Sequence, residues 1–549
     1  MIFNIFILPF AIISMLMIIF NSKKYAFYLA IAGVLLSGIF LALLSKNYFL
    51  NFNNLPLNHI INFGNGLYSL SSAFIIIFIF NTIFVLSQKN INFKELGFLF
   101  LYFSASIGFI FATDFIHLTI YFELLSLLGA CVILLSNNVL AKKVAIKYFV
   151  IHLFGGSIFL IGVIEYVIGT GSIFLPSEPL DLSYRFNYFL LMGLLINVGI
   201  PPLSSWLVDG YSKCSHNASI YLSVFTTKAS IFMILVLFNN NIALTYVGVI
   251  LSLYGLIFSS FETNFRRILA FSIIQQLGIM LIIFGFIDFS FSQFIVSYIV
   301  VNIFYKSLLF MLAKILSVHF GTNNIKNLQG VINIKSFLGF VLIFSSIQVL
   351  GLPISGGFIV KTYMLEQIHN KAILWFLFFL ASSSALNIGI RLPWTLLSFK
   401  NSSSKILFEN KLKFFSFAGI IIILQSIYFV NIQFVNLSTI LHSLEILLFS
   451  IVLFVIINKI ILKNKEEILQ RLVKSTLDVA YTGFIFMLYK LVHINIFNIF
   501  KISYRKVIKL FTNLQQNNQS FIYSLGFAQK LVLFSLVCLI FIYWFIRLF

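Results

Sequence analysis

Four ionisable side chains lie inside long apolar stretches, where a charge is costly: Glu123, Lys228, Lys306 and Lys361. Lys228 lies about ten residues from either end of its stretch, roughly 14 Å at 1.5 Å per residue, so its side chain is too short to reach a membrane surface. Its amine therefore needs a polar partner, a hydrated cavity or a neutral state. Burial favours the neutral amine and a nearby carboxylate favours the charged one, so such groups can hold and release protons in turn. The four residues are predicted to form a proton relay.

A structural role is the alternative, because a buried Glu–Lys pair can fix the packing of two helices without carrying protons. Four charges inside apolar stretches favour transport. Glu123 shares a helical face with Thr119, Ser126 and Ala130, and this small, polar stripe predicts that the face packs inward. His152 lies in the next apolar stretch and either extends the relay or makes a packing hydrogen bond.

Two apolar stretches are interrupted by proline and glycine, which free backbone carbonyls for neighbours, water or ions. Two such interruptions in corresponding halves of a chain predict a transport path, with packing kinks as the alternative. The positions concerned are Asn197, Pro201 and Pro202 in the first stretch, and Pro353, Gly356 and Gly357 in the second.

The remaining polar residues predict little further chemistry. Asp114, Asp209, Glu262 and Asp288 lie at helix ends, where solvated or capping roles are expected. The three cysteines have no paired spacing, and the sequence contains no phosphate loop, Cys/His metal pattern or nucleophile elbow. Neither a cofactor nor a metal is therefore predicted.

The composition places these residues in a membrane. The 549 residues are 60% hydrophobic and 9% charged, whereas soluble domains carry about 25% charged residues. A soluble enzyme, a disordered chain and a fibrous repeat are thereby excluded. Sixteen spanning helices are predicted from the apolar stretches, at 2–20, 25–44, 67–86, 95–113, 115–135, 146–168, 187–207, 219–238, 242–261, 268–287, 293–316, 336–368, 371–391, 414–430, 438–461 and 530–548.

Loop charge predicts the orientation of these helices. If the N-terminus lies outside, alternate loops hold twenty lysines and arginines, and the opposite loops hold three, Lys46, Arg185 and Lys371. Positive residues gather on the cytoplasmic side of membrane proteins, so this alternation supports both the orientation and the helix count. The net charge of +21 thus indicates basic loops rather than nucleic-acid binding.

Six ordered blocks resemble the Mrp-type cation/proton antiporter subunits and the large antiporter-like subunits of respiratory complex I. In this resemblance Glu123 stands at the family's key glutamate. The pattern from Val144 to Ile173, together with the helix that contains Thr226-Thr227-Lys228, is most similar to the D subunit of the Mrp antiporters. The blocks are residues 113–124, 199–211, 225–228, 265–278, 302–310 and 355–361.

The resemblance implies an all-α membrane fold of about fourteen core helices, arranged as two inverted five-helix repeats with one broken helix each. C-terminal helices bring the predicted total to about sixteen. The expected divisions are N-terminal helices at 1–94, repeats at 95–238 and 242–391, C-terminal helices at 392–461, an amphipathic interfacial or cytoplasmic region at 462–529 and a last helix at 530–549.

The sequence departs from the family pattern at three positions. The family has a relay lysine where this chain has Asn197, and histidines where it has Ser204 and Asn302. Asparagine can hydrogen-bond water but cannot carry a proton at neutral pH. These departures leave open a relay that is rerouted through Lys228 or lost.

The favoured hypothesis is a membrane subunit of a multi-subunit Na⁺/proton antiporter, with the other subunits, protons, Na⁺ and the lipid bilayer as its partners. One alternative is a proton-translocating subunit of complex I, which would make it part of an enzyme, and another is an assembly paralogue without transport. The bacterial inner membrane is the expected location, with the mitochondrial inner membrane as the alternative.

Overall fold

The computed structural model divides into two compact units, Met1–Ser475 and Thr476–Phe549. The described residues all belong to the first unit: 2–19, 23–45, 60–88, 90–136, 139–176, 178–285, 292–352, 355, and stretches within 377–398 and 445–452. Several predicted features lie outside them, namely Asp288, Pro353, Gly356, Gly357, Lys361, the helices at 414–430 and 530–548, and the region 462–529.

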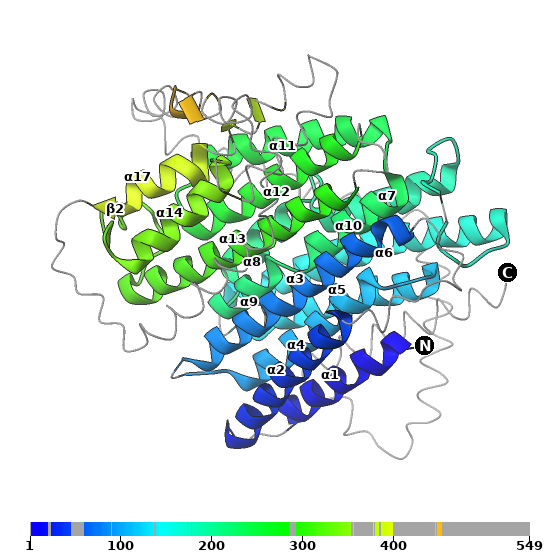
Figure 1. Ribbon diagram of the computed structural model, residues 1–549, viewed down its shortest axis with the longest axis horizontal. Helices are drawn as coiled ribbons and strands as arrows, with labels where there is room; N and C mark the ends of the chain where they lie inside the picture. Colours follow the sequence, from blue (N-terminus) through cyan, green and yellow to red (C-terminus); the bar gives the residue numbers. More distant parts are fainter. Residues whose placement is uncertain are drawn as a thin grey trace. The chain divides into compact units, whose positions relative to one another are not determined.

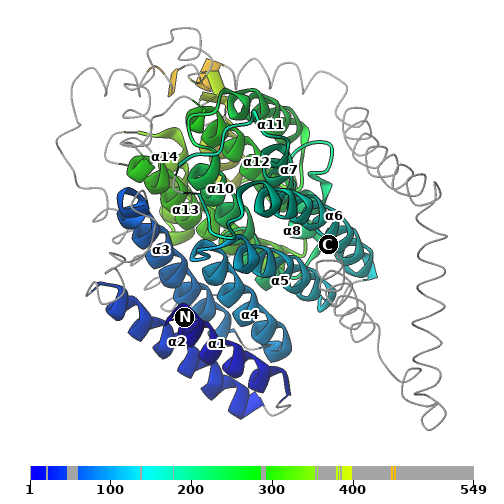
Figure 2. The same cartoon turned by 90° about the vertical axis from the view of Figure 1, so that its right-hand side faces the viewer.

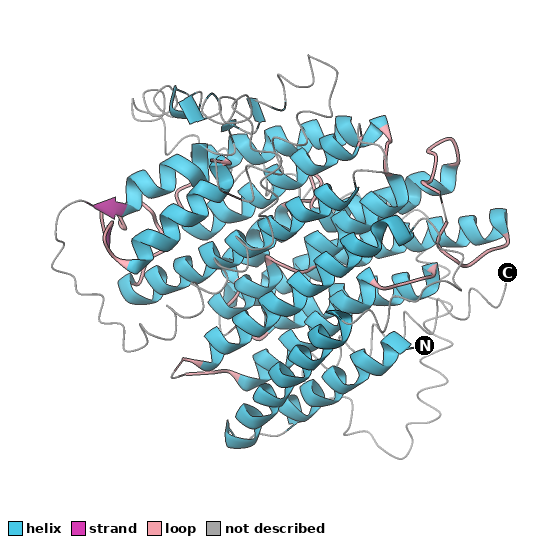
Figure 3. Ribbon diagram, in the orientation of Figure 1, coloured by secondary structure: helices cyan, strands magenta, loops and turns pink. Residues whose placement is uncertain are grey.

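The described part is built almost wholly of helices (Figure 3). A parallel pair of two-residue strands, β1 with β2, is the exception among these residues. The elements are α1 Ile2–Ile19, α2 Lys23–Ser45, α3 Ile60–Leu86, α4 Phe93–Ile110, α5 Phe115–Leu134, α6 Val139–Thr170, α7 Arg185–Val198, α8 Ser205–Lys213, α9 His216–Leu222, α10 Thr226–Phe238, α11 Ile242–Phe261, α12 Phe265–Phe284, α13 Ser292–Phe320, β1 Ile332–Asn333, α14 Phe337–Leu350, η2 Leu386–Arg391, α17 Leu392–Leu396 and β2 Leu397–Ser398.

The described residues include nine helices that are long and apolar enough to cross a membrane. These helices and the shorter apolar ones pack side by side, with α1 on α4, α3 on α13 and α11 on α12 (Figures 1 and 2). The helices at the centre differ from those at the edge, because α12 and α13 are almost wholly buried whereas α2 exposes most of its apolar side chains. This pattern is that of a helical bundle whose outer helices present apolar side chains to lipid.

An internal repeat is visible in the loops. The backbone before α5 pairs with the segment after α6, where the N–H of Phe115 donates to the Ile173 carbonyl at 2.9 Å. The backbone before α12 pairs in the same way with the segment after α13, where the N–H of Phe265 donates to the Asn323 carbonyl at 2.8 Å. Residue 114 pairs with residue 174, and residue 264 pairs with residue 324, so the second pairing repeats the first 150 residues later.

Equivalent helices of the two repeats share the same kind of N-terminal cap or the same kind of C-terminal residue. Asp114 caps α5 by accepting from the N–H three residues on, and Asn264 caps α12 in the same way, as short polar side chains at helix N-termini commonly do. Helices α7 and α14 each have 14 residues and end at a left-handed glycine, Gly199 (φ 95°) and Gly351 (φ 70°). A side chain is disfavoured in that conformation, which explains the glycines.

The first predicted interruption separates α7 from α8, with Pro201 and Pro202 between them. The indole N–H of Trp206 donates to the Ile196 carbonyl at 3.1 Å, so a protein group satisfies part of the freed backbone. Another break, which neither of the two predicted interruptions covers, lies further along the chain. The stretch expected as one helix at 219–238 is divided into α9 and α10 at residues 223–225, with no proline or glycine to signal it.

Four of the described turns that carry predicted cytoplasmic charge, those after α3, α5 and α8 and before α12, meet at one end of the bundle, here called the basic face. The N–H of Ser215 donates to the Ser136 hydroxyl at 2.7 Å, and Gln88 donates to Asn217 at 3.3 Å. The Arg266 guanidinium donates to the carbonyl oxygen of Cys214 at 2.8 Å. The turns after α3, α5 and α8 and before α12 are therefore held together.

Candidate functional site

Lys228 is the third residue of α10, directly after the break, and its side chain is completely buried. Its Nζ donates to the Ser223 carbonyl at 2.8 Å and to the Thr227 hydroxyl at 3.3 Å. The break thus provides the polar partner that the sequence required for this amine. That partner is a neutral carbonyl, and none of the described residues forms an ion pair with this amine.

Lys306 on α13 is also completely buried. Its Nζ donates to the hydroxyl of Ser272 on α12. It lies close enough to Lys228 for the two amines to interact electrostatically. Like charges repel strongly where the dielectric constant is low, so these two amines on α10 and α13 form an electrostatically coupled pair.

Glu123 is half-buried on α5, and its carboxylate lies against the backbone of Gly156 on α6. A Cβ atom at position 156 would come within 1.8 Å of Glu123 Oε1. Within the described residues, neither a hydrogen bond nor an ion pair joins this carboxylate to another side chain, so the structure does not bring it together with Lys228. The predicted stripe is inward at Ser126 and Ala130, while Thr119 is half-buried.

The repeat explains the placement of Glu123 and Lys306. Gly156 and Lys306 are 150 residues apart and occupy corresponding positions on α6 and α13. In the first repeat a carboxylate from α5 reaches toward α6, and in the second an amine from α13 reaches toward α12. The equivalent helix pairs, α5 with α6 and α12 with α13, therefore each carry one ionisable group. It is the carboxylate of Glu123 in the first repeat and the amine of Lys306 in the second.

His152 and Asn197 lie on α6 and α7, which pack together beside α10. Both side chains are completely buried, and the two ring nitrogens of His152 and both polar atoms of Asn197 have no hydrogen-bond partner in the described part of the protein. The imidazole stacks on Tyr148 at 4.2 Å and lies edge-on to Trp206 at 4.3 Å between ring centroids. It faces the Asn197 amide without completing a hydrogen bond.

Five residues lie on helices that pack in succession, α5, α6, α7, α10 and α13, and we call them the polar row: Glu123, His152, Asn197, Lys228 and Lys306. Buried polar groups without protein partners are normally hydrogen-bonded to water. A hydrated series of a carboxylate, an imidazole and two amines has the chemistry needed to pass protons. Asn197 can orient water within the row, but cannot itself take up a proton.

The other two departures from the family pattern, Ser204 and Asn302, are both buried. Ser204 donates its hydroxyl hydrogen to Tyr254 at 3.0 Å. Asn302 is buried one helical turn before Lys306, and its Nδ2 has no partner within the described residues. Asn302 is also 150 residues from His152, so the repeat places an amide in one half where the other half has an imidazole.

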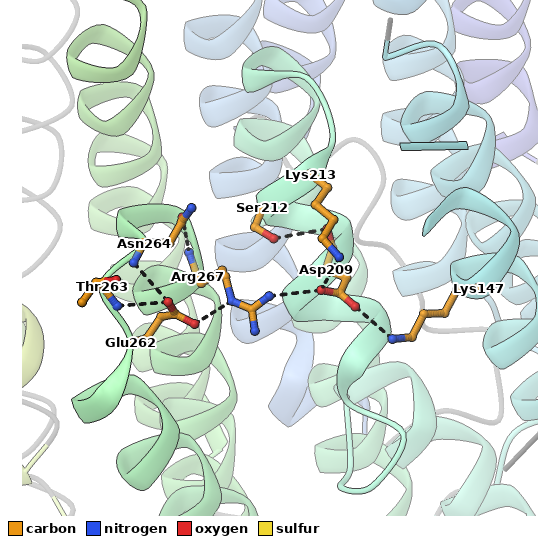
Figure 4. A network of polar contacts seen from close by, with 8 residues as sticks. All are labelled: Lys147, Asp209, Ser212, Lys213, Glu262, Thr263, Asn264 and Arg267. Carbon is orange, nitrogen blue, oxygen red and sulfur yellow. Dashed lines mark hydrogen bonds and ion pairs between the residues drawn. The ribbon is translucent and has the colours of Figure 1, made fainter. Parts of the chain in front are cut away.

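Asp209 forms a buried ion network at the basic face, although a solvated or capping role was expected (Figure 4). Its carboxylate contacts Lys147 at 2.9 Å, Lys213 at 3.0 Å and Arg267 at 3.2 Å. Arg267 also binds Glu262 at 2.6 Å. The network joins α6 and α8 of the first repeat to α12 and the residue that follows α11 in the second, so it stabilises the contact between them.

The charge balance around Asp209 decides its ionisation. Burial alone would raise the pKa of this carboxyl, but Lys147, Lys213 and Arg267 together hold the pKa below its usual range. Asp209 is therefore ionised throughout the physiological pH range. Sequence spacing could not have indicated this network, because Lys147 and Arg267 lie 62 and 58 residues away from Asp209.

The part of the chain that contains the polar row matches a known protein family. Residues 112–387, just over half of the chain, match the family described as NADH:quinone oxidoreductase/Mrp antiporter, TM. The chain is 25% identical over 270 residues to the D subunit of the Na(+)/H(+) antiporter of Bacillus subtilis, covering 46% of this chain and 55% of that one. It is 24% identical over 349 residues to the N subunit of the NADH-quinone oxidoreductase of Campylobacter jejuni, covering 57% and 71%. The chain spans little more than half the length of the first of these relatives.

Solved structures share the fold over a larger part of the chain. A chain of the Mrp complex from Dietzia sp. DQ12-45-1b aligns with a TM-score of 0.64 at 15% identity, covering 81% of this chain and 96% of that one. A chain of respiratory complex I from Thermus thermophilus aligns with a TM-score of 0.62 at 16% identity, covering 78% and 96%. These likenesses confirm the predicted all-helical membrane fold of antiporter-like subunits.

Proposed function

The chain belongs to the NADH:quinone oxidoreductase/Mrp antiporter family, and from this membership we propose that it is the proton-carrying membrane subunit of a multi-subunit Na⁺/proton antiporter. The similarity to antiporter D subunits supports the choice of complex. The proposal rests on one observation above all: the buried side chains of His152 and Asn197 have no hydrogen-bond partner among the described residues, and two buried amines are held by neutral oxygens. A row built for packing would instead have its polar groups paired.

The proposed relay runs from Glu123 through the His152–Asn197 region to Lys228 and Lys306, with Lys361 as its last member. A proton on Lys306 makes protonation of Lys228 unfavourable, and the reverse holds, because the two amines repel when both are charged. Movement of one proton along the row therefore prepares the next transfer. The neutral carbonyl and hydroxyl partners allow each amine to lose its proton without leaving a buried carboxylate uncompensated.

We place the subunit in a bacterial inner membrane, with its N-terminus outside and the basic face in the cytoplasm. The distribution of lysine and arginine between alternate loops supports this orientation. Cysteine accessibility tests it directly. A cysteine introduced at Lys143, which is exposed at the basic face, should react with a membrane-impermeant thiol reagent from the cytoplasmic side alone.

A complex I subunit is the second candidate, because the N-subunit relative is covered over more of its length than the D-subunit relatives. Complementation separates the candidates. The whole gene set containing this chain should restore sodium tolerance to an antiporter-deficient host. Failure of complementation together with association with an NADH-oxidising complex would establish the second candidate, and failure of both would leave an assembly role.

A further inference from the structure

A second group of ionisable side chains lies at the basic face, apart from the polar row, with His216 and Lys314 half-buried and Glu95 buried. Glu95 on α4 is 5% exposed, and its carboxylate accepts a hydrogen bond from Ser215. Lys314 on α13 donates to the amide oxygen of Asn217 and attracts Glu95 electrostatically from beyond direct ion-pair distance. His216 shares a hydrogen bond of 2.7 Å with the Ser317 hydroxyl. We call Glu95, Ser215, His216, Asn217, Lys314 and Ser317 the entry cluster.

The composition of this cluster suits proton exchange. It combines a carboxylate, an imidazole and an amine. The hydroxyl and amide groups between them both donate and accept hydrogen bonds, so they can bind these three groups whether protonated or not. The amine of Lys314 is bound to a neutral amide, so it can lose a proton without leaving an unpaired partner charge. The cluster ends at loops of the basic face, where Gln88 also donates to Asn217 at 3.3 Å.

Hydrogen-bonding side chains continue from this cluster toward Lys306. Tyr221 lies one helical turn beyond Asn217 on α9, and its hydroxyl shares a hydrogen bond of 2.9 Å with Thr82 on α3. The residue before Thr82, Asn81, accepts from Ser307 at 2.8 Å, and Ser307 follows Lys306 in the chain. The helices concerned, α3, α9 and α13, contact one another (Figure 1).

Most of these intermediate groups are fully buried, and the Nδ2 of Asn81 has no partner within the described residues. An unpaired buried donor of this kind is a binding point for a bridging water. Lys314 and Lys306 are two helical turns apart on α13, about 12 Å. The described residues thus place separate hydrogen-bonded pairs between the basic face and the polar row, and bridging water would be needed to join them.

We propose that the entry cluster is the site at which protons are exchanged between the basic face and Lys306, with Lys314 and Glu95 as its proton-carrying pair. The inference rests on the proposed transport function and adds the route by which one side of the membrane reaches the row. One proton leaves the Lys314 ammonium as one proton is gained by the Lys306 amine. Each intervening hydroxyl or water gives up one proton for each that it accepts, so none of them is changed.

Other ionisable groups face the cluster from neighbouring elements. The side chain of Lys94 is exposed and adjacent to Glu95 in sequence. Groups that interact electrostatically with members of the cluster are Cys214 before α9, Tyr221 on α9 and Arg266 on α12. Arg266 is held by backbone carbonyls and stays charged. The titratable groups inside the cluster are therefore Glu95, His216 and Lys314.

The test uses the assembled complex in inside-out membrane vesicles, with proton movement followed by a fluorescent dye. Glu95→Gln and Lys314→Gln should each slow transport roughly tenfold or more, as loss of an acid–base group does. Both variants should also shift the pH at which proton transport is half-maximal when the pH is varied at the basic face. When the pH is varied at the opposite face, this midpoint should stay the same as in wild type. Glu95→Asp should retain most of the activity. The control, Lys143→Gln, removes an exposed lysine from the same face and should behave as wild type.

Wild-type rates and pH profiles in both variants would overturn the entry cluster, as would a uniform slowing that is the same for both faces. Lys314→Gln leaves the bond between Glu95 and Ser215 intact, so it gives a reading even if Glu95→Gln lowers the amount of assembled complex. Lys228→Ala separates the two proposals. If it stops transport while both cluster variants are normal, the entry cluster alone is wrong. If it also has no effect, the proposed relay fails.

Discussion

Replacing Asp209 by asparagine tests whether the ion network holds the two repeats together. The variant keeps the size of the side chain but leaves Lys147, Lys213 and Arg267 without their shared anion. The Asp209 side chain is 10% exposed and those of Lys147 and Arg267 are 8% and 16% exposed, so solvent screens these contacts little. At an effective dielectric constant of about 20, a pair at roughly 3 Å gains about 5 kcal/mol before desolvation. Removing one partner of a buried pair costs about 3–5 kcal/mol net.

We therefore expect Asp209→Asn to lower the free energy of unfolding of the subunit by about 3–5 kcal/mol. Intrinsic fluorescence during thermal or denaturant unfolding in detergent would measure it. Glu165→Gln is a matched control, because Glu165 pairs at 2.8 Å with Arg185, whose side chain is 77% exposed. Such an exposed pair contributes about 0–1 kcal/mol. Equal stability losses in the two variants would refute the assignment.

The lowered pKa of Asp209 adds a pH dependence to the same experiment. Because the pKa of this carboxyl is lower in the folded state than in the unfolded state, its stabilising contribution is complete above the unfolded pKa of about 4. It is lost as the pH falls through the lower folded pKa. The stability difference between wild type and Asp209→Asn should therefore shrink in acid, and a difference that grows instead would contradict the network.

Three further substitutions each test a single position. Gly156→Ala should slow transport without preventing assembly, because the new Cβ would displace the flexible Glu123 side chain. The control is Gly38→Ala, whose new Cβ meets nothing within 4 Å, and it should leave transport unchanged. Gly199→Ala should lower the free energy of unfolding by about 1–2 kcal/mol, since the residue has φ 95°, and an unchanged unfolding midpoint would contradict that reasoning. Asn197→Lys should raise the proton transport rate of the reconstituted complex if this position limits the relay, and an unchanged rate would remove that idea.

Much of the fold could be predicted from the sequence, because long apolar stretches and basic loops follow directly from the properties of a bilayer. The break between α7 and α8 was predicted from Pro201 and Pro202. The break before Lys228 was not, since it has no helix-breaking residue. There the Lys228 amine binds the Ser223 carbonyl, a contact within one segment that leaves no mark in hydropathy.

The site was predicted in part. Burial of Lys228 and Lys306 followed from their position within apolar stretches, and their roles stay predictions. Glu123 was expected to act with a lysine, but its neighbour is the backbone of Gly156. The polar groups between helices depend on which side chains the fold brings together, as with Glu95 and Lys314, which lie far apart in the sequence. Residue spacing along one helix carries no information about such pairs.

Proton transport by Lys228→Ala in the assembled complex tests the central claim most directly. Purified complex, reconstituted in vesicles with an imposed Na⁺ gradient, should lose sodium-driven proton movement when the buried amine is removed. Lys143→Ala, at the exposed basic face, should retain it. Normal proton movement by Lys228→Ala, in a complex that contains the full amount of this subunit, would contradict the relay.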